Sequence, residues 1–406
     1  MTTKLRAASF QDGAVTTAKI ASNAITNAKI ADGAIDSDAI GSLAITNAKL
    51  AADANKGRRN IAINGAMQIA QRGTSQASIT TAGYYTVDRF LVENGSFGTW
   101  TQTQEADAPT GQGYYNSLKM DCTTAQGSPS SNSILLVGQS IEGFMLQPIK
   151  QGTANAESTT LSFWHKHTKT GTNIVELLDA DNSNAVSGSY TQSSSDTWEK
   201  ATITFPANTS GAYDNDNARS LRIRFIMGAG TDYTSGTLAT TWQTSITDAN
   251  RYAGQVNNAD STSNNFIITG VQYEVGTAAS DFEFLPIDIN LQRCQRYCLI
   301  VGDSPDGRDY SKEANVGMYY TSTGFYGNTF FQTPMRSAPS ASIQGGTDAA
   351  KVFSNGSSRT SASIGLNGAS RSNMSFAIST SSATSGDSGT FDWNGAGHYC
   401  ICSAEL

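Results

Sequence analysis

The chain has few charges, few prolines and no long apolar run. Charged residues make up only 15% of the 406 residues, and proline occurs 8 times. No stretch of about eighteen apolar residues is present, so we expect no membrane insertion. The formal net charge of −7 comes without a basic tract, which argues against nucleic acid as a partner. The opening MTTKLRAASF lacks the apolar segment of a cleavable export signal, so export by that route is not expected.

Cysteine is also scarce, and its spacing fits neither zinc nor a disulfide framework. Cys122 stands alone, Cys294 and Cys298 are four positions apart, and Cys400 and Cys402 are two apart. Without a C-x-x-C pair, zinc is not predicted, and the cysteines are expected to be small buried hydrophobes. Assembly in a reducing cytosol fits this pattern best.

Glycine and small polar residues are abundant instead. The sequence has 38 glycines, and Ser, Thr, Asn and Ala crowd the segments between short apolar stretches. This composition favours an extended, mainly β architecture with many turns over a helical enzyme.

Residues 1–59 carry an apolar residue at every fifth position. Turn residues such as Asp12-Gly13 and Asp32-Gly33 reset the chain, so the true repeat is ten residues long. Burying eight apolar side chains gains on the order of 16 kcal/mol, while ordering about forty residues costs about 1 to 2 kcal/mol each. The segment is therefore expected to need copies from other chains to complete its core. The apolar positions are Val15, Ile20, Ile25, Ile30, Ile35, Ile40, Ile45 and Leu50.

Two other structures fit the repeat less well. A pentapeptide-type square β-helix requires a small residue two positions before each apolar one, and this occurs only in alternate pentads. A disordered linker would not need so strict a period. Both stay open alongside an intertwined stem.

Residues 60–286 read as short strands with Gly, Asn, Ser and Asp loops. LSFWHKH, EKATITF and LRIRFIM alternate apolar and polar residues, as strands with one solvated face do. We expect an antiparallel jelly-roll sandwich with one wet face.

Residues 287–300 interrupt this pattern and predict a short helical joint. Asp288 or Asn290 can cap the helix, and Leu291, Cys294 and Cys298 recur at helical spacing. These three apolar residues are expected to add to the oligomer core. Residues 301–406 return to strands and predict a distal β-sandwich.

Several motifs could carry chemistry, and each also has a plain structural interpretation. Ser304 in CLIVGDSPDGRD resembles an esterase nucleophile, but the only later histidine, His398, stands six residues after its nearest upstream acid, Asp392. His165 and His167 could face a metal from one strand, although no third ligand lies nearby in the sequence. We predict no catalytic residue and no metal-binding residue.

Two acidic loops leave structural calcium open. LLDADNSN at 177–184 and YDNDN at 213–217 concentrate oxygen ligands, as calcium sites do. The same residues are ordinary in turns. No other cofactor is expected.

Aromatic residues are the best candidates for a binding surface, because sugar C–H groups stack on rings while hydroxyls pair with Asn, Asp and Gln. Alternation in GMYYTSTGFY forces one of Tyr319 and Tyr320 outward. Trp100, Trp164, Trp198 and Trp242 lie in the sandwich segment and favour a core role. The predicted contact residues are Tyr319, Tyr320, Phe325, Tyr326 and Trp393.

Several segments together resemble the tail-fibre and receptor-binding proteins of bacteriophages. They are NIAINGAMQIAQRGTS, YYTVDRF, TWEKATITF, NNFIITGVQYEVG, FEFLPIDINLQRCQRYC, the closing AEL and the AITNAKIADGAI repeats. The resemblance covers about residues 60–300 well and the last hundred more loosely. It departs from the usual pattern at Cys298, where an aromatic residue is more common.

The resemblance implies a homotrimeric virion appendage with a carbohydrate-binding-module-like jelly roll. Its N-terminus would attach to phage tail proteins, and its distal β-domain would meet a host cell-surface polysaccharide. The protein would assemble in the host cytoplasm and act in the virion. We therefore expect a structural, host-attachment tail fibre and not an enzyme. A tail-associated polysaccharide-degrading enzyme and a bacterial glycan-binding adhesin are the alternatives.

Overall fold

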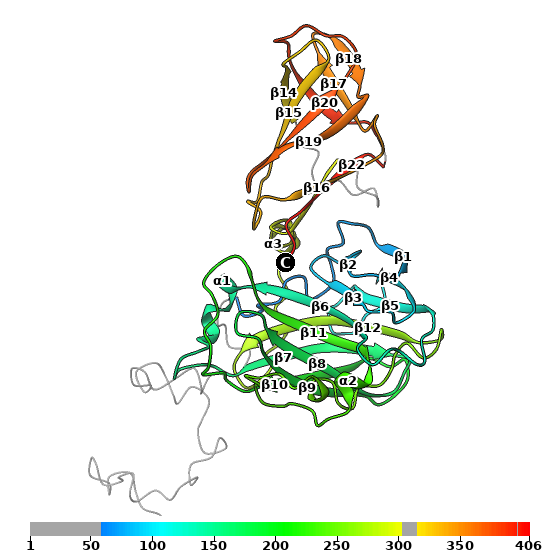
Figure 1. The fold of residues 1–406 in the computed structure, drawn as a ribbon, viewed down its shortest axis with the longest axis vertical. Coiled ribbons are helices and arrows are strands. Elements are labelled where there is room, and N and C mark those ends of the chain that lie inside the picture. Colours follow the sequence, from blue (N-terminus) through cyan, green and yellow to red (C-terminus); the bar gives the residue numbers. More distant parts are fainter. Residues whose placement is uncertain (1–57, 303–314, 396) are drawn as a thin grey trace, which may run out of the picture. The chain divides into compact units, whose positions relative to one another are not determined.

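The computed structural model describes residues 58–302, 315–395 and 397–406 (Figure 1). Most of the regular structure in this part of the chain is strand, arranged in antiparallel sheets. The prediction of a mainly β fold is therefore confirmed. The decapeptide repeats, with the predicted oligomer-core positions from Val15 to Leu50, lie outside the described residues.

Two six-stranded antiparallel sheets form a sandwich. Sheet A has, in spatial order, β1 (Ser75–Ile79), β4 (Thr99–Glu105), β5 (Ser117–Thr124), β12 (Asn265–Val275), β7 (Thr159–His167) and β10 (Glu199–Phe205). Sheet B has β2 (Gly83–Tyr84), β3 (Leu91–Asn94), β6 (Ile134–Glu142), β11 (Arg219–Ala229), β8 (Gly171–Asp179) and β9 (Asn184–Gln192). Consecutive strands such as β5, β6, β7 and β8 alternate between the two sheets, as strands of a jelly roll do.

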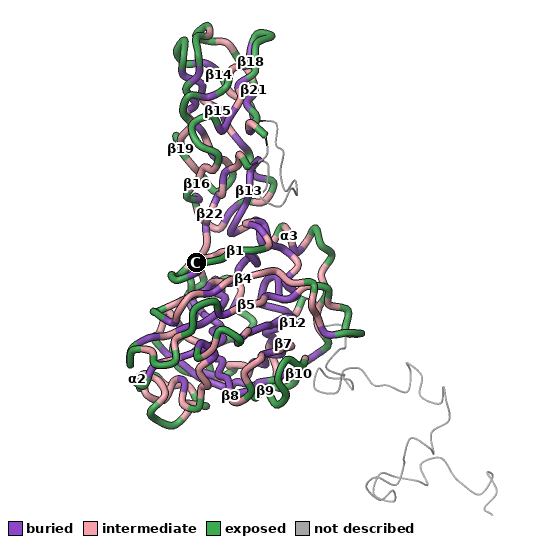
Figure 2. The backbone as a smooth tube through the Cα atoms, turned by 90° about the vertical axis from the view of Figure 1, so that its right-hand side faces the viewer, coloured by how far each residue is buried: buried purple, intermediate pink, exposed green. Residues whose placement is uncertain are grey.

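The apolar residues that alternate along the strands face inward and form the core between the two sheets. Phe163 on β7 and Phe225 on β11 meet edge to face across the two sheets, with ring centroids 5.0 Å apart. Leu161, Leu221 and Ile223 share this core. Figure 2 shows buried residues along the strands of the sandwich, with exposed residues gathered in the connections.

The outer face of sheet B is not the wet face that alternation predicts. The connection from β11 to β12, with α2 (Thr231–Thr234) and η6 (Asp248–Asn250), covers it. The amide of Ser187 on β9 donates to the carbonyl of Ala239, 2.8 Å away. Arg224 lies under this cover and pairs with the buried Glu176 on β8, which Arg251 of the connection also contacts. Alternation cannot reveal a covering loop, because it reports only which residues share a face.

Short helices complete the sandwich and lead out of it. They are α1 (Gly143–Leu146), η5 (Gln147–Ile149) and α3 (Ile287–Gln295). None of the helices in the described ranges is both long enough and apolar enough to cross a membrane.

The helix after the sandwich is shorter than the sequence predicts. α3 ends at Gln295, and Cys298 begins strand β13 (Cys298–Gly302), which pairs with β22 (Tyr399–Ser403). Cys294 and Cys298 are fully buried within one chain, so the structure corrects their assignment to an oligomer core. Leu291 is half-buried and packs on the cluster that contains Cys294, Ile63 and Ile69. The helical spacing was real as far as Cys294, but pairing with a strand about a hundred residues away decides the conformation from Cys298 onward.

Two further sheets form the distal part of the chain. Sheet C has β13, β22 and β16 (Ser340–Gln344). Sheet D has, in spatial order, β18 (Ser357–Thr360), β17 (Ala350–Ser354), β21 (Ser388–Trp393), β14 (Asn315–Tyr319), β15 (Gly324–Phe330), β20 (Asn373–Ser379) and β19 (Ser363–Ala369). A common core joins them and includes Val301, Phe376, Phe391 and Cys402.

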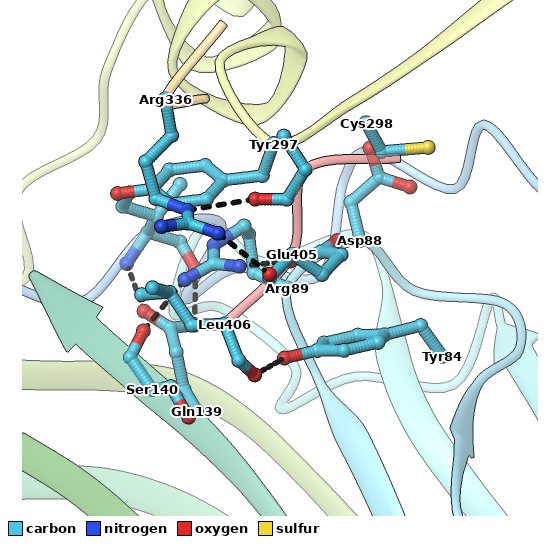
Figure 3. A network of polar contacts seen from close by, with 12 residues as sticks. Tyr84, Asp88, Arg89, Gln139, Ser140, Tyr297, Cys298, Arg336, Glu405 and Leu406 are labelled. Carbon is cyan, nitrogen blue, oxygen red and sulfur yellow. Dashed lines mark hydrogen bonds and ion pairs between the residues drawn. The ribbon is translucent and has the colours of Figure 1, made fainter. Parts of the chain in front are cut away.

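A buried ion pair ties the distal part to the sandwich (Figure 3). Arg89, only 1% exposed, pairs with the carboxylate of Glu405 and donates to the carbonyl of Ser140 over 2.6 Å. Its guanidinium also lies over the Tyr297 ring, 3.5 Å from the centroid. Arg72 pairs with the same carboxylate at 3.3 Å. The sandwich therefore supplies two cations to one acid near the end of the distal part.

Backbone carbonyls complete the same network. Arg336 donates from Nε to the carbonyl of Ala404 at 2.8 Å and from Nη2 to that of Glu405 at 3.0 Å. Its Nη1 donates to the carbonyl of Asn217 in the sandwich at 2.9 Å. The hydroxyl of Tyr84 donates to the carbonyl oxygen of Leu406 at 3.0 Å. Figure 3 shows Arg89 and Arg336 beside Glu405, and the hydroxyl of Tyr84 directed at Leu406.

Removing the Glu405 charge should destabilise the fold strongly. Glu405→Gln leaves Arg89 buried without its counter-charge, and breaking a buried pair from one side costs about 3 to 5 kcal/mol. The measurement is the free energy of unfolding of the full chain in urea, followed by circular dichroism. Glu157→Gln is the control, since its partner Lys150 is exposed, and it should cost less than about 1 kcal/mol. Equal losses in the two variants would contradict the prediction.

Asp88 should make the stability depend on pH. Burial raises its pKa from 3.8 to about 6, with Arg72 and Gln71 opposing the shift. The folded state holds this proton more tightly than the unfolded chain, so the contribution is full below the unfolded pKa and is lost as pH rises through about 6. We expect the free energy of unfolding of the native chain, relative to Asp88→Asn, to fall by up to about 3 kcal/mol from acid to neutral pH. Parallel pH profiles for the two proteins would exclude this.

Candidate functional site

The outward face of sheet D is the candidate site, and we call it the distal face. Its residues alternate along each strand with those of the distal core. Several large apolar side chains on it are exposed, which is uncommon for one face of a sheet. They are Val316 (48%), Met318 (50%), Phe330 (57%), Phe353 (43%) and, just after β14, Tyr320 (47%).

The structure separates the five predicted contact residues into two groups. Tyr319, Phe325 and Trp393 belong to the distal core and are at most 7% exposed. Tyr319 even satisfies its hydroxyl inside, against that of Thr380 at 2.8 Å. Tyr320 is exposed and Tyr326 is half-buried, and both lie at the distal face. Alternation predicted that one residue of the Tyr319–Tyr320 pair points outward, and the structure shows that it is Tyr320. Alternation could not show that only two of the five rings are accessible.

Tyr320 and Tyr326 form a stacked pair. Their ring centroids are 4.0 Å apart, and the planes differ by 13°. Gly324 makes room for this, because a Cβ there would lie 2.6 Å from the Tyr320 ring. The neighbouring Tyr326 raises the pKa of Tyr320 above its ordinary value, so the Tyr320 hydroxyl is a neutral donor and acceptor at physiological pH.

Polar residues separate the other apolar side chains of the distal face. Val316 stands opposite Asn328 on one side and Thr390 on the other. Phe353 stands between Thr390 and Ser358, and Phe330 is opposite Asn373. Only the Met318 position directly faces Tyr326, which itself stacks on Tyr320. The continuous apolar surface is therefore small and is surrounded by hydroxyl and amide groups.

Charge on the distal face is limited to one cross-strand pair. Lys351 on β17 faces Asp392 on β21, and the other outward residues of the described strands of this sheet are uncharged. The face can stack a ring against Tyr320 and offer hydroxyl and amide partners around it. It offers a single carboxylate, Asp392.

Most tryptophan side chains of the sandwich are engaged in contacts within the protein. Trp100 is fully buried and donates to the carbonyl of Phe97 at 2.7 Å. Trp242 packs against the sandwich core, and Trp164 is half-buried on sheet A. Trp198 donates to Asp107 at 3.1 Å, and Lys166 binds the same carboxylate at 2.9 Å.

The two histidines of β7 have protein partners. His165 Nδ1 meets the side-chain oxygen of Gln192 at 2.8 Å, and His167 Nε2 meets the Tyr190 hydroxyl at 3.0 Å. Burial lowers the pKa of both, His167 the more strongly, which keeps them neutral. Across residues 58–302, 315–395 and 397–406, no group of three or more His, Cys, Asp or Glu is placed to hold a metal.

The two loops considered for calcium lie side by side. The carboxylate of Asp179 accepts the amides of Asp181 and Asn182 at 3.1 and 3.0 Å, and the Gln151 side chain at 2.7 Å. Asp181 accepts the amide of Asp214 from the second loop at 2.9 Å. Hydrogen bonds thus link these loops.

The esterase-like constellation is not assembled in the described residues. Ser304 lies outside them. His398 directs Nδ1 to the carbonyl of Gly395 at 3.2 Å, and its Nε2 lies 3.9 Å from Asp348 and is not paired with Asp392. Asp392 is exposed on the distal face.

Sequence reasoning missed the exposed apolar residues of the distal face other than the tyrosines. Val316 and Met318 could have been found, since alternation places them on the same side as the outward tyrosine. Phe353 and Phe330 could not, because their place beside these residues depends on strand pairings between distant segments.

Comparisons with known proteins give weak likenesses in fold. No family model matches the sequence, and no curated protein does. The enzymatically active domain of tailspike protein 4 from bacteriophage CBA120 is 16% identical with a TM-score of 0.28, and the match spans 53% of this chain and 21% of that one. The CBM22-1 xylan-binding domain from Paenibacillus barcinonensis is 12% identical with a TM-score of 0.25, over 52% of this chain and 100% of that one. A family 11 carbohydrate-binding module from Clostridium thermocellum is 9% identical with a TM-score of 0.26, over 56% and 100%. At these values no shared function follows, and the distal face must be interpreted from its own residues.

Proposed function

We propose that this chain is a structural tail fibre of a phage virion that attaches to a cell-surface glycan through the distal face. The observation that carries the proposal is the exposed stack of Tyr320 on Tyr326, beside Met318 and surrounded by small polar residues. Pyranose C–H groups stack on such rings, and sugar hydroxyls pair with neighbouring hydroxyl and amide groups. The resemblance of the sequence to phage fibre proteins supports the virion setting.

The size of the apolar surface favours a sugar over a protein partner. Protein interfaces bury about 800 Å² on each side. Here polar residues such as Thr390, Asn328 and Ser388 interrupt the apolar side chains on neighbouring strands. A continuous apolar surface limited to Met318, Tyr326 and Tyr320 suits one or two sugar rings.

The same face favours binding over hydrolysis. Glycoside hydrolysis uses two carboxyl groups about 5 to 9.5 Å apart. The described strands of sheet D direct one carboxylate, Asp392, outward, and it faces Lys351. The distal face can therefore hold a glycan without supplying an acid and a base to cleave it.

Multivalency would turn weak sites into firm attachment. We infer a homotrimer, in which the repeats of residues 1–59 associate and the N-terminus joins phage tail proteins. Three sites on one fibre raise the effective affinity by roughly 10² or more. Assembly in the host cytoplasm agrees with the cysteines, which are all free and buried in the described residues.

Truncating the stacked tyrosines should reduce glycan binding. Tyr320→Ala and Tyr326→Ala each remove a ring that would contact the sugar. We expect a loss of about two- to tenfold in affinity per site, since stacking contributes about 0.5 to 1.5 kcal/mol. The measurement is retention of host polysaccharide by the purified full-length protein. Thr360→Ala, at the edge strand of the same face, is the matched control and should bind normally.

The same assay separates a binder from a hydrolase. Retained polysaccharide of unchanged length supports attachment, while shortened chains require an enzyme. If both tyrosine variants retain as much polysaccharide as the native protein, the distal face is not the glycan-binding site.

The oligomer should depend on the N-terminal segment. We expect a solution mass of three copies of the 42.8 kDa chain for the full-length protein, and a lower mass for a version that starts at Asn60, because the repeats need partner chains to bury their apolar residues. Analytical ultracentrifugation at micromolar concentration measures both. A monomeric full-length protein would contradict the trimer and with it the multivalent mechanism.

A further inference from the structure

A second exposed apolar surface lies where the described chain begins. We call it the entry patch, and it consists of Tyr114, Phe282, Phe284 and Ile287. Phe284 is 47% exposed and Ile287 57% exposed. The three rings touch one another, with centroids 5.2 Å apart for Tyr114 with each phenylalanine and 4.8 Å apart for the two phenylalanines. Unlike Val316, Phe330 and Phe353 of the distal face, which have polar cross-strand neighbours, these rings form one continuous cluster.

The entry patch is fixed to the first described residues of the chain. The backbone amides of Arg59 and Asn60 donate to the carboxylate of Glu283, at 2.8 and 2.7 Å. Arg293 of α3 donates to the carbonyl of Asn60 at 3.2 Å. Residues 282–287 therefore lie beside the point at which residues 1–57 join the sandwich.

Hydrogen bonds and ring contacts hold the cluster in place, with Tyr114 and Phe282 half-buried and Phe284 exposed. Glu283 is held by the two amides, so its neighbours Phe282 and Phe284 are held with it. Phe284 already contacts the chain from one side, because a Cβ on Gly113 would lie 3.2 Å from its ring. Two exposed charged residues lie near the cluster: Asp288 directly follows Ile287, and Arg58 directly precedes Arg59, whose backbone amide binds Glu283. A fixed apolar cluster with charges at its edge has the composition of a small protein interface.

We propose that the entry patch packs against a neighbouring copy of this chain in the oligomer. The inference rests on the proposed association through residues 1–57. That association brings Arg58 of each copy close to Arg58 of the others, and the entry patch lies within a few residues of it. A short tether raises the effective concentration to about millimolar, so a patch too small to hold free copies together can still be occupied.

A cysteine crosslink tests the contact in the full-length protein. All five native cysteines are buried in the described residues, so Ile287→Cys supplies an accessible thiol at the patch. We expect a short bismaleimide to join copies about tenfold faster at position 287 than at an equally accessible position away from the patch, as a tethered contact predicts. The products are read as dimer and trimer bands on a denaturing gel.

Ser235→Cys is the matched control, because Ser235 is exposed on the connection that covers sheet B. Fast crosslinking at 287 and slow crosslinking at 235, in a protein that sediments as an oligomer, supports the contact. An oligomer in which the 287 thiol reacts with the reagent but forms no bridge overturns the contact and assigns the patch to another partner, while the proposed function stands. A protein that sediments as a monomer overturns both.

Discussion

The buried pairing of Arg89 with Glu405 is the interaction on which the arrangement of the described chain depends. A guanidinium that is 1% exposed must have a counter-charge within reach. Its acid comes from a residue more than three hundred positions later, so the end of the distal part is bound to the sandwich. Arg89 also takes a left-handed backbone angle, with φ of +73°, which a non-glycine residue adopts only where its surroundings fix it. Tyr297, Ser140 and Arg72 supply those surroundings.

Four residues of this network lie in motifs that carry the resemblance to phage fibre proteins. Arg89 lies in YYTVDRF, Arg72 in AQRGTS, Tyr297 in CQRYC and Glu405 in the closing AEL. Four of the seven segments that carry the likeness therefore take part in joining the sandwich to the distal part. None of these four side chains is free to contact a glycan, so the motifs that contain them carry no information on a ligand. Under the proposed glycan attachment, contacts to the sugar would come from other surfaces, such as the distal face.

Features that follow from local residue periodicity could be predicted from the sequence, and features that depend on pairing between distant segments could not. Alternation predicted the mainly β architecture and the outward position of one residue of the Tyr319–Tyr320 pair, because both follow from the two-residue period of a strand. Helical spacing failed at Cys298, because this residue pairs with β22 and belongs to a strand. Alternation did not show that Phe325 and Trp393 are buried, because their burial depends on which strands pair. It failed again at sheet B, whose outer face is covered by a later connection. Each failure concerns a partner that is distant in sequence.

The two exposed apolar surfaces differ in a way that supports the different partners proposed for them. On the distal face the apolar residues alternate with small polar ones across the strands, as Phe353 does between Thr390 and Ser358. Such a surface gains little from dry packing against protein, because burial would leave the hydroxyl groups without partners. A glycan brings its own donors and acceptors and can satisfy them. The entry patch has the opposite composition, with Phe284 and its neighbouring rings in direct contact. Continuous rings gain most when water is excluded, and a tethered copy of the same chain is the surface that their position makes available.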